Sequence, residues 1–154
     1  MLTHSREVVL NALMTLLQTT VFSLPVRDQT TFVVTSRRLM HWSDVPKTSR
    51  PALFLTCHEE ETTWRSEYVP VYQKLSTKVF IYLDTEEKST TYTPDTDISV
   101  ILDAIDVVLS PIVTPAQTLG GLVSHCRVDG PILRDPGDMD GDGMIIIPIA
   151  ITLT

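Results

Sequence analysis

The chain of 154 residues is long enough for one domain with a sizeable core. Hydrophobic residues make up 43% of it, which excludes a disordered chain, and charged residues only 20%, which leaves surface that partners can bury. The formal net charge of −7 argues against tight binding to nucleic acid, although an acidic protein can let DNA slide past it.

The N-terminal segment has the pattern of an amphipathic helix. Apolar residues from Val9 to Leu17 recur at steps of three and four, Thr3 or Ser5 can cap the helix, and Pro25 follows as its stop. Polar residues interrupt the apolar ones, so the segment does not resemble a signal peptide. Since no stretch approaches about 18 consecutive apolar residues, we expect no membrane span.

Three segments rich in β-branched or alternating apolar residues predict strands at 30–38, 51–59 and 77–85. Residues 59–76 show no clean period, so we predict a long loop or an extended arm there. Loops of this length are often functional.

Isoleucines and leucines at helical spacing predict a second helix at 97–111. Asp95 or Asp97 can cap it, and Pro111 ends it. After this helix the pattern returns to strands.

The last third predicts a long hairpin, in which 118–133 leads to an acidic turn and 144–154 returns. In the return strand the odd residues are large and belong to a core, and the even ones are smaller but mostly apolar, so we expect a helix or another subunit to cover them. Pro148 cannot donate to a ladder and indicates an edge or a bulge. The order α-β-β-β-α-β-β predicts a single α+β domain over 1–154, with two helices on a mainly antiparallel sheet and a mixed sheet as the alternative.

The stretch DPGDMDGDG begins like a calcium-binding EF-hand loop, with Asp138, Asp140 and Asp142 at its first, third and fifth positions. The twelfth position, which needs a bidentate Glu, is Ile149, and strand-forming residues stand where a second helix is required. We therefore predict a polar hairpin turn, keep weak calcium binding as a remote alternative, and expect replacement of the three aspartates by Asn to leave folding intact.

Cys57-His58 and His125-Cys126 are Cys/His pairs on predicted strands. Without a signal peptide the compartment is expected to be reducing and the cysteines to be thiols. Neighbours on a strand point to opposite faces, so the four residues cannot easily converge on zinc. Both cysteines alternate with apolar residues, and we predict them to be small core residues.

Asp103 and Asp106 lie one turn apart on the second predicted helix and could form an acid/base pair, but a solvated polar face is the simpler interpretation. The chain contains no GxGxxG, P-loop, GxSxG or HExxH motif. We therefore predict no enzyme and no cofactor.

Trp42, Trp64, Tyr68 and Tyr72 fall in predicted loops. Such residues are favoured at protein interfaces, but they can equally fold back onto their own domain. With the long loop and the doubly apolar last strand they indicate assembly. The candidate interface residues are Trp42, Trp64, Tyr68, Tyr72, Asp138, Asp140, Asp142 and Pro148.

Residues 117–153, QTLGGLVSHCRVDGPILRDPGDMDGDGMIIIPIAITL, resemble the C-terminal hairpin of tail terminator proteins from long-tailed bacteriophages. The TLGG run at 118–121, the V-x-H-C-x-V/I-x-G pattern ending at Gly130, and the acidic glycine turn before an apolar strand carry the resemblance. The rest agrees more loosely, through the PALFL strand, the long loop, the V-x-I-Y strand and the I-L-D-A-I helix. Arg127 departs from the pattern, which has an aromatic residue there.

The resemblance implies a structural virion protein of the neck, assembled in the bacterial host cytoplasm, without membrane contact. Such proteins form a homo-oligomeric ring, usually a hexamer, on the head-proximal end of the tail tube. The ring stops tube polymerisation and contacts the tail tube protein and a head–tail connector or stopper protein, and DNA passes through it without specific binding. Another neck or tail-tube-like subunit is the alternative. Two acidic sets are candidates for the lining of the hole: Asp138, Asp140 and Asp142, or Glu59, Glu60 and Glu61.

Overall fold

The computed structural model describes residues 3–24, 30–68, 70–86, 92–110 and 116–153. Pro25 and Pro111, the predicted helix stops, lie outside the described residues. The described elements are, in chain order, α1 (Arg6–Gln18), β1 (Val34–Ser36), the 3-10 turns η1 (Trp42–Asp44) and η2 (Lys47–Ser49), β2 (Ala52–Trp64), β3 (Pro70–Asp84), α2 (Pro94–Leu109), β4 (Val123–Val128), β5 (Leu133–Asp135) and β6 (Asp142–Leu153).

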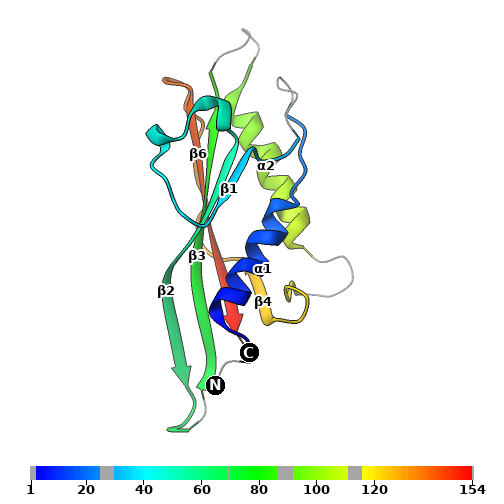
Figure 1. The fold of residues 1–154 in the computed structure, drawn as a ribbon, viewed down its shortest axis with the longest axis vertical. Coiled ribbons are helices and arrows are strands. Elements are labelled where there is room, and N and C mark those ends of the chain that lie inside the picture. Colours follow the sequence, from blue (N-terminus) through cyan, green and yellow to red (C-terminus); the bar gives the residue numbers. More distant parts are fainter. Residues whose placement is uncertain (1–2, 25–29, 69, 87–91, 111–115, 154) are drawn as a thin grey trace.

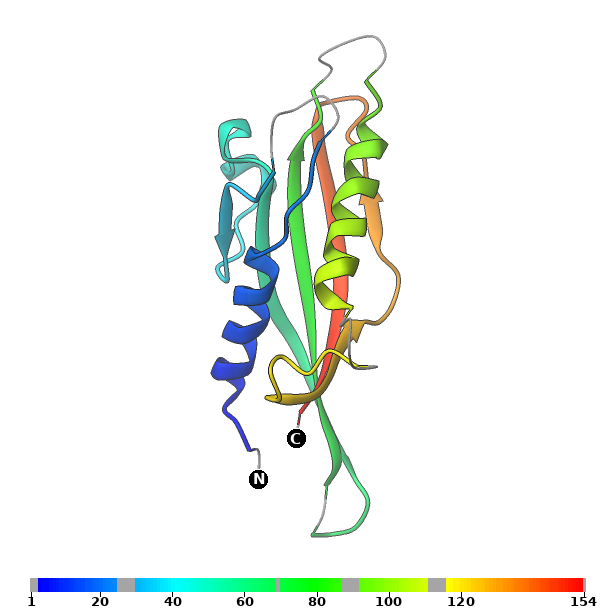
Figure 2. The same ribbon diagram turned by 90° about the vertical axis from the view of Figure 1, so that its right-hand side faces the viewer.

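In the described part of the chain, six strands form one sheet in the order β1-β2-β3-β6-β4, with β5 also paired to β6. All neighbours run antiparallel except β1 and β2, which are parallel. Helices α1 and α2 lie on one face of this sheet (Figure 1, Figure 2). The predicted α+β class with a mainly antiparallel sheet is confirmed, and the sheet is of the mixed kind.

The core lies between that face and the helices. The odd residues of β6 from Ile145 to Leu153 point into it, and none of them is more than 5% exposed, as the alternation predicts. Val79 and Ile81 of β3 lie opposite Ile147 and Ile145 and are fully buried. Burying such side chains contributes about 1.5–3 kcal/mol each, so this layer is a main source of stability. The predicted apolar stripe of α2 packs on it through the buried residues Ile98, Ile101, Ile105 and Leu109.

The helix starts follow local capping chemistry. Ser5 caps α1, as predicted, because its hydroxyl accepts a hydrogen bond from a backbone N–H of the first turn at 3.3 Å. Helix α2 begins at Pro94, whose fixed φ suits a first helical position. The prediction that Asp95 or Asp97 caps α2 is wrong, since both lie in its first turn.

The carboxylates of that first turn make contacts with other groups. The Tyr92 hydroxyl donates to Asp97 at 2.6 Å, and Asp97 is 1% exposed. Arg134 of β5 donates to Asp95 at 2.8 Å and to Ser99 at 2.8 Å. These bonds hold the start of α2 against β5.

Residues 59–76 form an arm in which β2 and β3 remain paired as far as Trp64 opposite Pro70. The prediction of a loop over this segment is wrong, and that of an extended arm is confirmed. Towards the tip of the arm, Gln73 is the outermost β3 residue that pairs with β6. Beyond it only β2 and β3 are paired, and this two-stranded part projects past the rest of the molecule (Figure 1, Figure 2). The outer half of β2 is exposed on both faces, so apolar and polar residues do not alternate there and the strand leaves no period in the sequence.

The C-terminal hairpin is present, but its first half is divided between two strands. β4 pairs with β6 residues 149–153, and β5 pairs with residues 144–146. Pro148 lies at the interruption between them, where its carbonyl accepts from the Asp129 N–H at 3.1 Å. The prediction that Pro148 marks an edge or a bulge is corrected: β6 is an interior strand, and its proline falls where the neighbouring ladder is broken.

The sheet face opposite the helices is covered over only part of its length. Near the start of β6 the connection from β1 to β2 covers it, and Phe54 and Tyr82 are buried there with Met144 packed against them. We expected a helix or another subunit on this face, but at this end a loop of the same chain covers it. Towards the end of β6, Pro148 and Thr152 remain half-buried.

Candidate interaction surfaces

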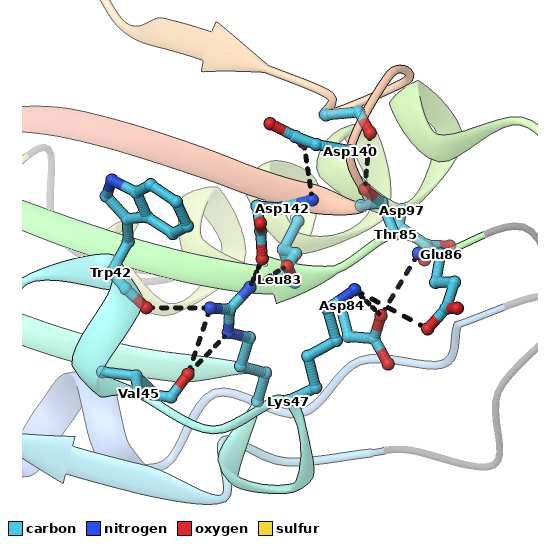
Figure 3. Close-up of polar contacts among 12 residues, drawn as sticks. Trp42, Val45, Lys47, Leu83, Asp84, Thr85, Glu86, Asp97, Asp140 and Asp142 are labelled. Atoms are coloured by element: carbon cyan, nitrogen blue, oxygen red, sulfur yellow. Dashed lines mark hydrogen bonds and ion pairs between the residues drawn. The ribbon is translucent and has the colours of Figure 1, made fainter.

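A buried arginine holds the connection between β1 and β2 against the start of β6. The side chain of Arg50 is 3% exposed. Its guanidinium donates to the carbonyl oxygens of Trp42, Val45 and Leu83 at 2.9 to 3.2 Å and to Oδ1 of Asp142 at 2.5 Å (Figure 3). A buried charge is tolerated only when it is paired and hydrogen-bonded, so this set of bonds ties the loop, β3 and β6 together.

Two further side chains reinforce the same end of the sheet. Lys47 lies 4.0 Å from the Asp84 carboxylate and 3.6 Å from that of Glu86 (Figure 3). The Tyr82 hydroxyl donates to the Met40 carbonyl at 2.7 Å. Burial raises the pKa of Tyr82 against the opposing effect of the nearby guanidinium, so the hydroxyl remains a donor at neutral pH.

The carboxylates of the DxDxDG stretch have different partners. Asp142 is bound to Arg50, Asp140 accepts from the Asp142 N–H at 2.9 Å, and Asp138 is exposed. Ile149, at the twelfth position of the motif, is 1% exposed in the core. Among the described residues no three His, Cys, Asp or Glu side chains lie close enough to hold a metal ion. The stretch is therefore a polar turn in which one aspartate has a structural partner.

The backbone of this turn is fixed by its own hydrogen bonds. The Gly141 N–H donates to the Gly137 carbonyl at 2.8 Å, and the Thr85 N–H donates to the Gly141 carbonyl at 2.9 Å. Gly137 has a φ of +66°, and a Cβ there would lie 2.5 Å from the carbonyl carbon of Asp142. Met139 at the tip is 98% exposed. The turn is thus closed by backbone hydrogen bonds, and its tip is exposed to solvent.

The candidate aromatic residues are exposed but do not form one surface. Trp42 is 42% exposed and lies on η1, near the Arg50 end of the sheet. Trp64 and Tyr68 are 60% and 86% exposed at the tip of the arm, and Tyr72 is 38% exposed at its base. Three of the four therefore lie on the arm, and Trp42 lies at the other end of the sheet.

A groove of about 280 Å³ lies near the base of the arm, on the sheet face opposite the helices. Thr152 of β6 lies opposite Lys74 of β3 and His125 of β4, and Ala150 lies opposite Arg127. Small residues form its floor and longer polar side chains its walls. The lining residues are Tyr72, Lys74, His125, Arg127, Asp129, Ala150 and Thr152.

The cysteines differ in environment. Cys126 is 2% exposed in the core, as predicted, and burial raises its pKa to about 12. Cys57 is exposed, so its prediction as a core residue is wrong. It lies on β2 beyond Phe54, the last residue that pairs with β1, where the sheet edge is uncovered among the described residues. Desolvation raises its pKa as well.

The Cys/His pairs lie on β2 and β4, which are separated in the sheet by β3 and β6. The structure therefore does not bring them together. On α2, Asp103 and Asp106 are both exposed, as a solvated face requires. No helix in the described ranges combines the length and apolar character needed to cross a membrane.

Ion pairs at the surface connect α1 with the edge of the sheet. Arg6 donates to both carboxylate oxygens of Glu60 on β2, at 2.7 and 2.5 Å. Arg37 donates to Glu7 at 2.7 Å. Hydrogen bonding to the arginine lowers the pKa of Glu60 and of Glu7 in each pair. Since these groups are exposed, the pairs orient α1 more than they stabilise it.

The TLGG segment before β4 forms a left-handed turn. Leu119, Gly120 and Gly121 have φ values of +51°, +74° and +91°. The Gly121 and Val123 N–H groups donate to the Thr118 carbonyl at 3.0 and 3.2 Å. Leu119 is 8% exposed and packs into the core, which holds a non-glycine residue in a strained conformation.

A scan of the chain against protein-family models found no match, and a search of curated proteins also found none.

Proposed function

We propose that this chain is a ring-forming tail terminator of a long-tailed bacteriophage. The observation that carries the proposal is the resemblance of residues 117–153 to the C-terminal hairpin of that family. In this chain those residues contain β4, β5, β6 and the acidic turn. The order of the elements supports the proposal, because it roughly matches the expected α-β-β-β-α-β-β, with β5 as an additional strand after α2.

In this role copies of the chain form a ring, a hexamer by resemblance, on the head-proximal end of the tail tube. The ring stops tube polymerisation, contacts a connector or stopper protein of the head, and lets DNA pass in the neck of the virion. Exposed carboxylates around the hole would repel the DNA backbone and prevent sticking. The exposed Asp138 and Asp140, or Glu59 and Glu61, are candidates for this lining, whereas Asp142 is bound to Arg50.

Contact with other chains has support in the edges of the sheet. β1 pairs with β2 only as far as Ser36 opposite Phe54. Beyond Phe54 no described strand pairs with the outer edge of β2, which runs on to Trp64. A long uncovered edge is a common place for contact with another chain, and three consecutive glutamates, Glu59 to Glu61, restrict which chains it accepts.

Imaging and mass measurement test the proposal. The purified chain is expected to form rings, alone or on the ends of purified tail tubes, and negative-stain electron microscopy would show one ring per tube end. A chain that stays monomeric at high concentration and also leaves tube ends uncapped would sink the proposal. Stacking of the chain into long tubes of its own would instead favour a tail-tube subunit.

A further inference from the structure

The outer edge of β2 is a strand edge that the fold leaves open. β1 pairs with β2 only from Ala52 to Phe54, and beyond that point no described strand pairs with this edge. β2 itself runs on to Trp64, and its residues 57–61 are exposed. An edge strand presents unpaired backbone N–H and C=O groups to solvent, and an extended segment of another chain can pair with them.

The most regular part of this edge lies between two irregularities of the β2–β3 pairing. Register shifts occur between Cys57 and Glu59 and after Thr63, and residues 59–63 pair continuously with residues 72–76 of β3. Pairing on the inner side already holds these residues in an extended conformation, so a further strand on the outer side does not have to order them. Residues 59–63 are therefore a preformed template for one more strand.

The three glutamates of this stretch point to different faces of the sheet. Glu59 and Glu61 lie in the same rows as the groove floor on β6, on the face away from the helices. Glu60 lies on the helix face, where Arg6 of α1 donates to both of its carboxylate oxygens. The Arg6–Glu60 pair balances the charge on the helix face, which leaves an uneven pattern: two carboxylates at alternate residues on the other face.

These two carboxylates set the chemistry of a matching strand. Lys74, the cation beside Glu61 on β3, pairs with Asp129 at 3.5 Å, and among the described residues neither Glu59 nor Glu61 forms an ion pair. Alternate residues of a strand lie on one face about 7 Å apart, so a neighbouring strand faces both carboxylates with two of its own alternate residues. Opposite charges at such cross-strand positions stabilise pairing, and like charges oppose it.

The strands of this chain do not supply such a partner. Two β2 edges paired around Glu60 would set carboxylate against carboxylate. Among the described strands, β4 is the one with basic residues at alternate positions, His125 and Arg127. Its outer edge is already occupied, because the Gln117 carbonyl accepts from the Cys126 N–H at 2.8 Å. The matching strand therefore belongs to another protein.

We propose that the open edge of β2 at 59–63 binds an extended segment of a partner protein that carries Lys or Arg at two alternate positions, facing Glu59 and Glu61. Backbone hydrogen bonds to the edge supply affinity, and the two ion pairs select the sequence. The residue between the two basic ones faces the Arg6–Glu60 pair and is uncharged. This contact does not depend on the ring proposed above, so either proposal can fail alone.

A peptide with this charge pattern is the probe. A threonine peptide of about eight residues, with lysine at two alternate positions, spans 59–63 and reaches Cys57. In one matched peptide the two lysines are adjacent and point to opposite faces, and in another glutamates replace them. Cys57 is exposed, so the rate at which a maleimide labels it reports occupancy of the edge. The alternating-lysine peptide should slow labelling and bind about threefold tighter than the adjacent-lysine peptide and about tenfold tighter than the glutamate peptide.

Two variants of the chain show whether the glutamates cause this preference. In Glu59→Gln with Glu61→Gln, the three peptides should bind with dissociation constants within about twofold of one another. Asp103→Asn with Asp106→Asn removes the same charge from the exposed face of α2 and should retain the preference. Thermal unfolding checks that both variants fold.

The proposal is overturned by equal protection of Cys57 by all three peptides on the unmodified chain, by no protection from any of them at millimolar concentration, or by equal behaviour of the glutamine variant and the control. Because none of these measurements uses tail tubes, their outcome leaves the tail-terminator function to its own test.

Discussion

The opposite ends of the paired strands β3 and β6 use polar and aromatic residues for different purposes. At one end Arg50 is buried, and its guanidinium bonds hold the loop, β3 and β6 together. At the other end Trp64 and Tyr68 are exposed on a two-stranded arm. At the Arg50 end the polar groups bond to other groups of the same chain, whereas on the arm the large aromatic side chains are exposed and can contact a partner. We therefore expect substitutions to lower stability at the Arg50 end and to alter recognition at the arm.

The largest effect is expected at Arg50. Arg50→Met leaves the Asp142 carboxylate and three carbonyl oxygens without their donor, and breaking a buried charge pair in this way costs about 3–5 kcal/mol. Urea unfolding monitored by circular dichroism measures the loss. Arg65→Met, the matched change at the exposed arm, should alter the free energy of unfolding by less than about 0.5 kcal/mol. Equal losses in both variants would remove the distinction between the ends.

A smaller effect is expected within the acidic turn. Asp142→Asn removes the charge that faces the buried guanidinium and should lower the free energy of unfolding by about 1–3 kcal/mol. Asp138→Asn, at an exposed residue of the same turn, should change it by less than about 0.5 kcal/mol. The expectation that replacing all three aspartates leaves folding intact therefore changes, since Asp142 is not equivalent to the other two. Equal unfolding midpoints for both single variants would contradict this.

The arm is expected to tolerate change in stability. Trp64→Ser combined with Tyr68→Ser should lower the free energy of unfolding by less than about 1 kcal/mol, because both side chains are already exposed. Thermal unfolding at a low protein concentration, where copies do not associate, gives this number. A loss of several kcal/mol would show that the tip packs on its own subunit.

The cysteines give two readouts, the rate of thiol labelling and the pH dependence of stability. With a maleimide at pH 7, Cys57 is expected to react and Cys126 to react only after unfolding, because Cys126 is buried and its pKa is raised to about 12. The unfolded thiol has a pKa of about 8.5, so the folded chain retains a proton that the unfolded chain loses between these values. This thiol therefore lowers the free energy of unfolding as pH rises from about 8.5 to about 12, and Cys126→Ala should reduce that slope. Two equivalents of rapid labelling in the folded chain would contradict the burial of Cys126.

Much of the fold could be predicted from the sequence, because one-sided burial leaves a period. The odd residues of β6 and the stripe of α2 are buried as their spacing indicates. The outer half of β2 could not be predicted in this way, since solvent reaches both of its faces. The prediction that Pro148 lies at an edge or a bulge was wrong because a proline can also occur in an interior strand where the neighbouring ladder is broken. That break arises because β4 and β5 pair with separate parts of β6, which the sequence pattern does not indicate.

The candidate surfaces were predictable in part. The exposure of Trp64, Tyr68 and Tyr72 follows from their place outside periodic segments. The groove was not predictable, because Lys74 and His125 become neighbours only through the register of β3 and β4 on β6. Arg50 was also missed: an arginine before a proline in a polar loop looks exposed, and its burial follows from contacts with Leu83 and Asp142 that are distant in sequence.

The place of β6 in the sheet has a consequence for the order of folding during synthesis. β6 lies between β3 and β4, yet it is the last of the described elements to leave the ribosome. The β2–β3 hairpin is local in sequence and can form early, whereas the register that joins Leu75 to Ile151 must wait until β6 has been synthesised. Until then no central strand covers the apolar side chains of β3, α1 and α2. Because Ala150 and Thr152 of β6 form the floor of the groove, the groove exists only in chains whose sheet is already complete.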